Sequence, residues 1–230
     1  MKHAILGALA AGAVMVGGIA ATSQSALADG GKTYRVTIAN ATHGQPLAPG
    51  LIITYRESFS LFELNGVASL GLATMTETGN PGELAGEVIG THGVATADVL
   101  IGQNPPPGPP VAIPGESNSK EIRTGAKYIS VVGMLAATND AVYAVRGIRL
   151  PRNGKITVYA TAYDAGSELN SEAASDIPAL GNDAYSEEDG EGFIHVHNGV
   201  HGGGDLVPAD HDWRNPVVAI TIERFGGDDD

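Results

Sequence analysis

Apolar and polar residues alternate in several short segments of the chain. The alternation is most regular in segments 34–39 and 155–163, which carry Val36 and Ile38, and Ile156 and Val158, respectively. Successive side chains of a strand point to opposite faces, so this pattern is typical of strands that cover a core on one side. Segments rich in β-branched residues predict further strands at 50–55, 127–135, 141–150, 192–198 and 216–225.

Turn-forming residues separate these segments, and the chain has 32 Gly and 13 Pro in 230 residues. Seven or so short strands with frequent turns predict an all-β fold, an antiparallel β-sandwich or a barrel. Segments 61–72 and 80–90 mix Ala, Leu, Glu and Gly and predict short helices in connecting loops. The Pro-rich segment 102–110 is expected to form an extended surface loop.

The N-terminal segment has the layout of a secretory signal peptide. Lys2 and His3 precede an uncharged apolar stretch at 4–21, and Ala26-Leu27-Ala28 matches a cleavage site. The stretch is rich in Ala and Gly rather than Leu, which favours a signal peptide over a membrane anchor. We therefore expect a signal peptide at 1–28, a β-sandwich domain at 29–225 and a disordered acidic tail at 226–230. The protein would be exported to the periplasm, the cell surface or the medium.

Charge and cysteine content restrict the possible partners. The net charge is −13, and losing the signal peptide with Lys2 makes it one unit more negative. Phosphate backbones and anionic lipids repel such a chain, whereas divalent cations are attracted, so we expect no nucleic-acid partner. No segment after the signal peptide is apolar for long enough to span a bilayer, so we expect no membrane insertion. The absence of cysteine excludes disulfides, thiol catalysis and zinc–thiolate sites.

Two acidic turns form the first candidate site. Asn139 and Asp140 follow one predicted strand, and Asp164 and Glu168 follow another, with Gly166 allowing a tight turn between the last two. If both turns lie at the same end of a sandwich, their oxygens suit calcium, which takes six to eight oxygen ligands. Asp, Asn and Gly are also ordinary turn residues, and that alternative stays open at this point.

Five segments of the chain, taken in order, resemble the bacterial form of the spondin N-terminal domain. They are 42–49, 133–140, 148–151, 163–170 and 210–217, and together they extend over about residues 33–225. The resemblance implies a C2-like β-sandwich with a calcium ion at one end and, in the animal members, a role in the extracellular matrix.

Matched segment by segment, the resemblance implies calcium-ligand roles for Asp140 and Asp164. Glu168 stands where the family has a shorter acid, and Ala141 stands where the family has an aromatic residue. The chain also lacks the cysteines and thrombospondin repeats of the animal proteins. These differences bear on the third ligand and on matrix adhesion more than on the fold.

Histidines form the second candidate site. Four of the seven histidines lie close together in the sequence: His195, His197, His201 and His211. His195 and His197 are two apart on a predicted strand, so their side chains point to one face, and Gly202 to Gly204 allow His201 to fold back toward them. With Asp205 or Asp210 they make a candidate site for a transition metal such as copper or zinc. Histidines that only pack and hydrogen-bond in the fold are the alternative.

The remaining motifs are interpreted structurally. The acids Glu187, Glu188, Asp189 and Glu191 are expected in a solvated loop, with peripheral cation binding as the alternative. Trp213, the only tryptophan, is expected in the core beside the last strand, with a ligand-stacking platform as the alternative.

The function we expect is a non-enzymatic, exported calcium-binding module for extracellular or cell-surface adhesion to a protein or glycan. A histidine-based metal carrier or metalloenzyme and a structural assembly subunit are the alternatives.

Overall fold

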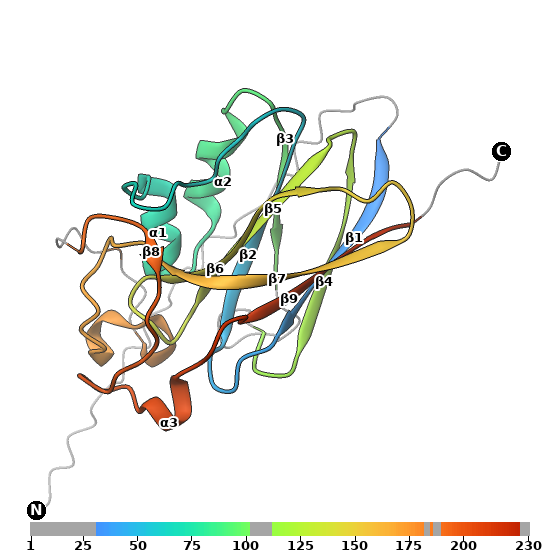
Figure 1. The fold of residues 1–230 in the computed structure, drawn as a ribbon. Helices are drawn as coiled ribbons and strands as arrows, with labels where there is room; N and C mark the ends of the chain where they lie inside the picture. The colour runs from blue at the N-terminus through green and yellow to red at the C-terminus, as the bar shows by residue number, and fades with distance from the viewer. Residues whose placement is uncertain (1–30, 102–111, 182–184, 186–189, 226–230) are drawn as a thin grey trace, which may run out of the picture.

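A computed structural model describes residues 31–101, 112–181, 185 and 190–225. The elements, in chain order, are β1 (Lys32–Asn40), β2 (Leu47–Tyr55), α1 (Leu70–Thr78), α2 (Gly82–Ile89), β3 (Val94–Leu100), β4 (Ser117–Thr124), β5 (Tyr128–Leu135), β6 (Ala141–Arg149), β7 (Lys155–Asp164), two 3₁₀ turns (Ala174–Asp176 and Pro178–Leu180), β8 (His195–Val196), α3 (Pro208–His211) and β9 (Val218–Arg224). The predicted all-β fold with short helices in its connections is confirmed (Figure 1).

The strands form an antiparallel sandwich in which β7 belongs to both sheets. The order is β3-β2-β5-β6-β7-β9-β1-β4, with β8 paired to the end of β7. Residues 155–160 of β7 pair with β9, and residues 161–164 pair with β6. At the other side of the sandwich, the Thr54 hydroxyl of β2 contacts those of Thr96 and Thr124 at 2.9 Å, which links β2 and β3 to β4. The sheet is therefore almost closed on itself.

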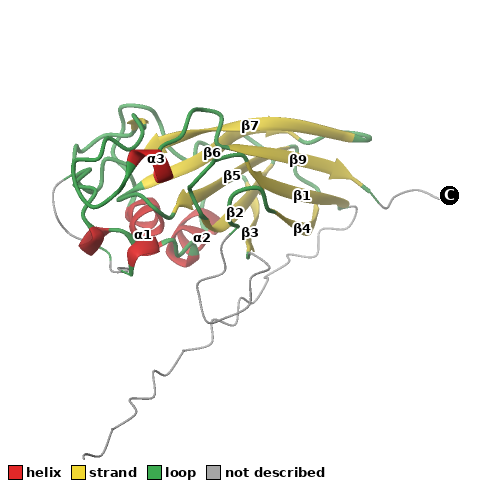
Figure 2. Cartoon of the chain, turned by 90° about the horizontal axis from the view of Figure 1, so that it is seen from below, coloured by secondary structure: helices red, strands yellow, loops and turns green. Residues whose placement is uncertain are grey.

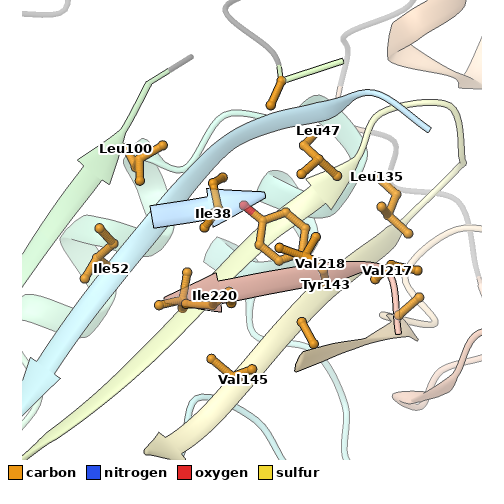
Figure 3. Close-up of a cluster of buried hydrophobic side chains, with 14 of the residues drawn as sticks. Ile38, Leu47, Ile52, Leu100, Leu135, Tyr143, Val145, Val217, Val218 and Ile220 are labelled. Carbon is orange, nitrogen blue, oxygen red and sulfur yellow. The ribbon is translucent and has the colours of Figure 1, made fainter. Parts of the chain in front are cut away.

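The main core lies between the two halves of this folded sheet. Tyr143 lies at its centre, near Ile38, Leu47 and Val218 (Figure 3). All four side chains are at most 1% exposed. Burial of each such side chain stabilises the fold by about 1.5–3 kcal/mol, so this cluster holds the sandwich together without disulfides.

The helices α1 and α2 cover the outer face of β2, β5 and β6 (Figure 2). Leu51 and Ile53 of β2 pack against the helices, whereas Ile52 faces the main core. Burial on both faces explains why β2 is an unbroken apolar run rather than an alternating one.

Several sequence predictions need correction in detail. The helix expected at 61–72 begins only at Leu70, because Asn65 takes a positive φ of 64° and Ser69 caps the helix by accepting a hydrogen bond from the Leu72 N–H. The strand expected at 192–198 is reduced to β8, His195–Val196. Two strands were not predicted: β4, a largely polar edge strand, and β3, which is half-buried over most of its length.

Some predictions fall outside the described residues: the signal peptide at 1–28, the Pro-rich segment 102–110, the acids at 187–189 and the tail at 226–230. Trp213 is buried in the main core, as expected. Within the part of the chain that the structure describes, no helix has the length and apolar character needed to cross a membrane.

Candidate metal centre

The two acidic turns meet at one end of the sandwich, because β6 and β7 are neighbours in the sheet. Asp140 immediately precedes β6, and Asp164 is the last residue of β7, where it pairs with Ala141. The Ala165 N–H also donates to the Asp140 carbonyl at 3.2 Å. The turns expected to share one end of the molecule are thus side by side, next to β8 (Figure 1).

Asp140 is completely buried, and its two carboxylate oxygens differ. Oδ2 accepts hydrogen bonds from the backbone N–H groups of Ser167 at 2.8 Å and Glu168 at 3.2 Å. Oδ1 has no hydrogen-bond partner among the described residues. Burial, and then the negative charge of Asp164, raise the pKa of Asp140 well above its ordinary value, although the two N–H groups act in the opposite direction. The fold thus positions an acid whose charged form it does not fully compensate.

Asp164 is also buried, with 1% of its surface exposed, and both of its oxygens accept one hydrogen bond. Oδ1 accepts from the Gly166 N–H at 2.8 Å, and Oδ2 accepts from the Asn170 amide at 2.7 Å. Gly166 has a φ of 64°, and a Cβ at this position would lie 2.4 Å from the Phe193 carbonyl oxygen. Only glycine permits this turn, and the turn directs the Ser167 and Glu168 amides at Asp140.

The remaining predicted calcium ligands lie in the same loops. Glu168 is buried and lies directly after the turn. Asn139 is buried too, but its amide ties two loops together: Oδ1 accepts from the Glu172 N–H at 3.1 Å, and Nδ2 donates to the Ser171 hydroxyl at 3.2 Å. Of the predicted set, Asp140, Asp164 and Glu168 are therefore the residues that carry carboxylates in these loops, whereas the Asn139 amide joins two loops.

No arginine or lysine among the described residues forms an ion pair with Asp140 or Asp164. In the described ranges, their ion pairs involve Glu121, Glu223 and Asp212 instead. Two imidazoles lie beside Asp164: His195 Nε2 is 3.7 Å from Oδ1, and His197 Nε2 is 3.7 Å from Oδ2.

The four predicted histidines do not form a single cluster. His195 and His197 both approach Asp164, a residue that the sequence had placed in the other candidate site. His197 and His201 line an open pocket of about 500 Å³, while the His211 ring contacts the Gly44 carbonyl at 3.4 Å. In the described part of the chain, one group of at least three His, Cys, Asp or Glu side chains has ligand atoms within 4.8 Å of one another: Asp164, Glu191 and His195.

His197 has both ring nitrogens occupied. Nδ1 accepts from the Gly199 N–H at 3.0 Å, so Nε2 carries the proton and donates to Asn170 Oδ1 at 3.1 Å. Burial lowers the pKa of His197, although the charge of Asp164 opposes this effect. A neutral, fully hydrogen-bonded imidazole orients Asn170 and has no lone pair left for a metal.

Sequence reasoning missed Asn170 and gave Glu191 only as part of an acidic run with peripheral cation binding as the alternative to a solvated loop. The Asn170 amide group donates to Asp164 Oδ2 and also to Glu191 Oε1, the latter at 3.1 Å. Glu191 was expected in a solvated acidic loop, and no regular spacing relates it to Asp164. Its proximity results from the chain returning past the Gly166 turn, where the Gly192 N–H donates to the Gly166 carbonyl at 2.8 Å.

Comparison with known proteins identifies no relative: no protein-family model and no curated protein matches this chain. The resemblance to the spondin N-terminal domain therefore remains a prediction from the quoted motifs.

Proposed function

We propose that this protein is an exported, non-enzymatic β-sandwich module that binds calcium in its end loops and presents them to an extracellular protein or glycan. The observation that carries the proposal is the buried Asp140 carboxylate next to Asp164, with an Oδ1 atom that has no hydrogen-bond partner among the described residues. A buried oxygen of this kind costs free energy unless a cation or a donor satisfies it.

Calcium suits the donors that the loops offer. Asp140 Oδ1, Asp164 and Glu168 supply hard carboxylate oxygens, and backbone carbonyls and water are the usual remaining ligands of this ion. The ion would neutralise two acids that repel each other and would link the turn before β6 to the turn after β7. Its binding free energy would then add to the stability of the folded state.

The surroundings of the site support a binding role. Leu169, Phe193 and Val196 lie on the loops that carry the acids or beside them, and all three side chains are exposed. Large exposed apolar groups gathered around a polar site are typical of interaction surfaces. We infer that calcium holds these side chains in one arrangement and so makes partner binding depend on calcium.

Metal analysis and calorimetry test the ion. Mature, untagged protein purified without chelator should contain one calcium per chain, and Asp164→Ala should abolish stoichiometric binding. Glu57→Ala is the matched control, because Glu57 is an exposed acid after β2, at the end of the sandwich opposite to Asp164. Equal calcium affinity in the two variants would contradict the assignment.

Binding assays with and without a chelator test the partner. Immobilised glycans and extracellular proteins should retain the calcium-loaded module and release it when the ion is removed. Retention that is unchanged in chelator would show that the ion does not shape the binding surface.

The alternative of a three-histidine metal centre receives less support from the geometry. His197 uses both ring nitrogens in hydrogen bonds. His195 differs from it, and that difference leads to the inference below.

A further inference from the structure

We propose that His195, Asp164 and Glu191 form a second cation position that takes a divalent transition metal of the zinc class, next to the calcium position and sharing Asp164 with it. The site goes beyond the proposed calcium function, because two of its three ligands are not in the calcium set and one of them is nitrogen.

The orientation of the His195 ring is the first step. Nδ1 lies 3.0 Å from the Val196 carbonyl oxygen, which can only accept a hydrogen bond. The proton of the neutral ring is therefore on Nδ1, and the lone pair is on Nε2. A ring N–H donated to a backbone carbonyl is the usual way in which a metal-binding imidazole is oriented.

The positions of the ligand atoms are the second step. His195 Nε2 lies 3.7 Å from Asp164 Oδ1, and one ligand atom from each of the three residues lies within 4.8 Å of the others. Two ligands bound to one zinc ion at about 2.1 Å are roughly 3.4 Å apart in a tetrahedron. The observed spacing requires only a small closing movement, which the exposed Glu191 side chain can make.

The outer support of the site is the third step. The Asn170 amide group donates one hydrogen to Asp164 and the other to Glu191, while its oxygen accepts from His197. Both carboxylates are thus held by one side chain whose orientation is fixed. Metal ligands commonly have outer hydrogen bonds of this kind, and losing such a bond lowers affinity about 10–100-fold.

The buried Asp140 oxygen without a described partner, which carries the calcium proposal, lies in the turn next to Asp164. The charges of both Asp164 and Glu191 act on Asp140, so negative charge collects at this end of the sandwich. Calcium satisfies the oxygens of such a group, but it has little preference for imidazole. A metal of the zinc class accepts imidazole and carboxylate together.

The test uses the full mature protein without a polyhistidine tag, titrated with Zn²⁺ in the presence of calcium. His195→Ala should lower zinc affinity at least about 10-fold, since a direct ligand contributes no less than an outer partner, and should leave calcium affinity unchanged. Asp140→Asn should lower calcium affinity and leave zinc affinity unchanged, and Asp164→Asn should lower the affinity for both ions. His92→Ala is the control, because the His92 side chain is exposed and pairs with Glu57 at the other end of the sandwich.

Electron paramagnetic resonance of the Cu²⁺-substituted protein supplies a second readout. One coordinated nitrogen should appear in the wild type and disappear in His195→Ala. Zinc affinity that is unchanged in His195→Ala, or the absence of zinc binding by the wild type, would overturn the second position. Calcium affinity that is unchanged in Asp140→Asn would instead count against the calcium proposal, so the two failures are distinguishable.

Discussion

Replacing Asp140 with asparagine separates the charge of this side chain from its shape. The amide oxygen can take the place of Oδ2 and accept from the Ser167 and Glu168 N–H groups, while the NH₂ group takes the place of Oδ1. The variant therefore keeps the hydrogen bonds of the turn and loses one negative charge. We expect its thermal stability to change in opposite directions with and without calcium.

The calcium effect follows from mass action. At a free calcium concentration 100 times the dissociation constant, binding stabilises the wild-type fold by about 2.7 kcal/mol. A change of 1 kcal/mol shifts the melting temperature of a domain of this size by about 2–4 °C. Calcium should thus raise the wild-type melting temperature by about 5–10 °C and that of Asp140→Asn by less than about 2 °C.

The effect in chelator follows from the raised pKa of Asp140. A group whose pKa is raised by folding contributes stability that is complete below its unfolded value and lost as the pH rises through its folded value. The ordinary value is 3.8, and burial and Asp164 raise it well above this. In chelator at pH 8, Asp140→Asn should therefore melt at or above the wild-type temperature, and the two should converge near pH 4.

Differential scanning calorimetry in calcium and in chelator, at both pH values, measures all of these quantities. Glu57→Gln, an exposed acid at the opposite end, should behave as the wild type throughout. A calcium shift in Asp140→Asn as large as that of the wild type would refute the reasoning, because the ion would then bind elsewhere.

Three further predictions concern the loops around the site. Glu172→Gln should lower the free energy of unfolding by about 1–3 kcal/mol at pH 7, because the Glu172 carboxylate accepts hydrogen bonds from the N–H groups of residues 201–203 at 2.5–2.7 Å. Burial alone would raise the pKa of Glu172, but these bonds lower it below the ordinary 4.5. In urea titrations, the stability difference between wild type and variant should therefore fade as the pH drops from about 5 toward 3. A stability difference that stays constant over this range would refute the contribution of the charged carboxylate. Gly166→Ala should lower the free energy of unfolding by at least about 1–2 kcal/mol in chemical denaturation, because of the positive φ and the nearby Phe193 carbonyl. It should also lower calcium affinity, and a wild-type calcium affinity would show that the turn adapts. Asn170→Ala should lower zinc affinity about 10–100-fold by calorimetry, and an unchanged value would remove Asn170 from the support of the site.

The fold could be predicted from the sequence where one face of a strand is buried and the other is not. Alternation identified β1 and β7, and the apolar run of β2 indicated a buried strand. β4 was not predicted, because an edge strand has only one neighbouring strand and tolerates polar residues such as those at 117–121. The start of α1 was predicted too early, because it depends on Ser69 as an N-cap. The hydrogen bond from the Leu72 N–H to the Ser69 hydroxyl cannot be read from composition.

The site was predictable only as far as strand neighbours determine it. Asp140 immediately precedes β6 and Asp164 ends β7, so their proximity follows as soon as these strands are recognised as adjacent. The position of Glu191 depends instead on how the chain passes the Gly166 turn. Whether a histidine can bind a metal depends on which of its ring nitrogens forms a hydrogen bond with a backbone group. His195 and His197 have the same spacing signal, yet a carbonyl beside one and an N–H beside the other leave only His195 with a free lone pair. The chemistry of the pair is thus set by single hydrogen bonds, so one-residue substitutions are the appropriate way to test it.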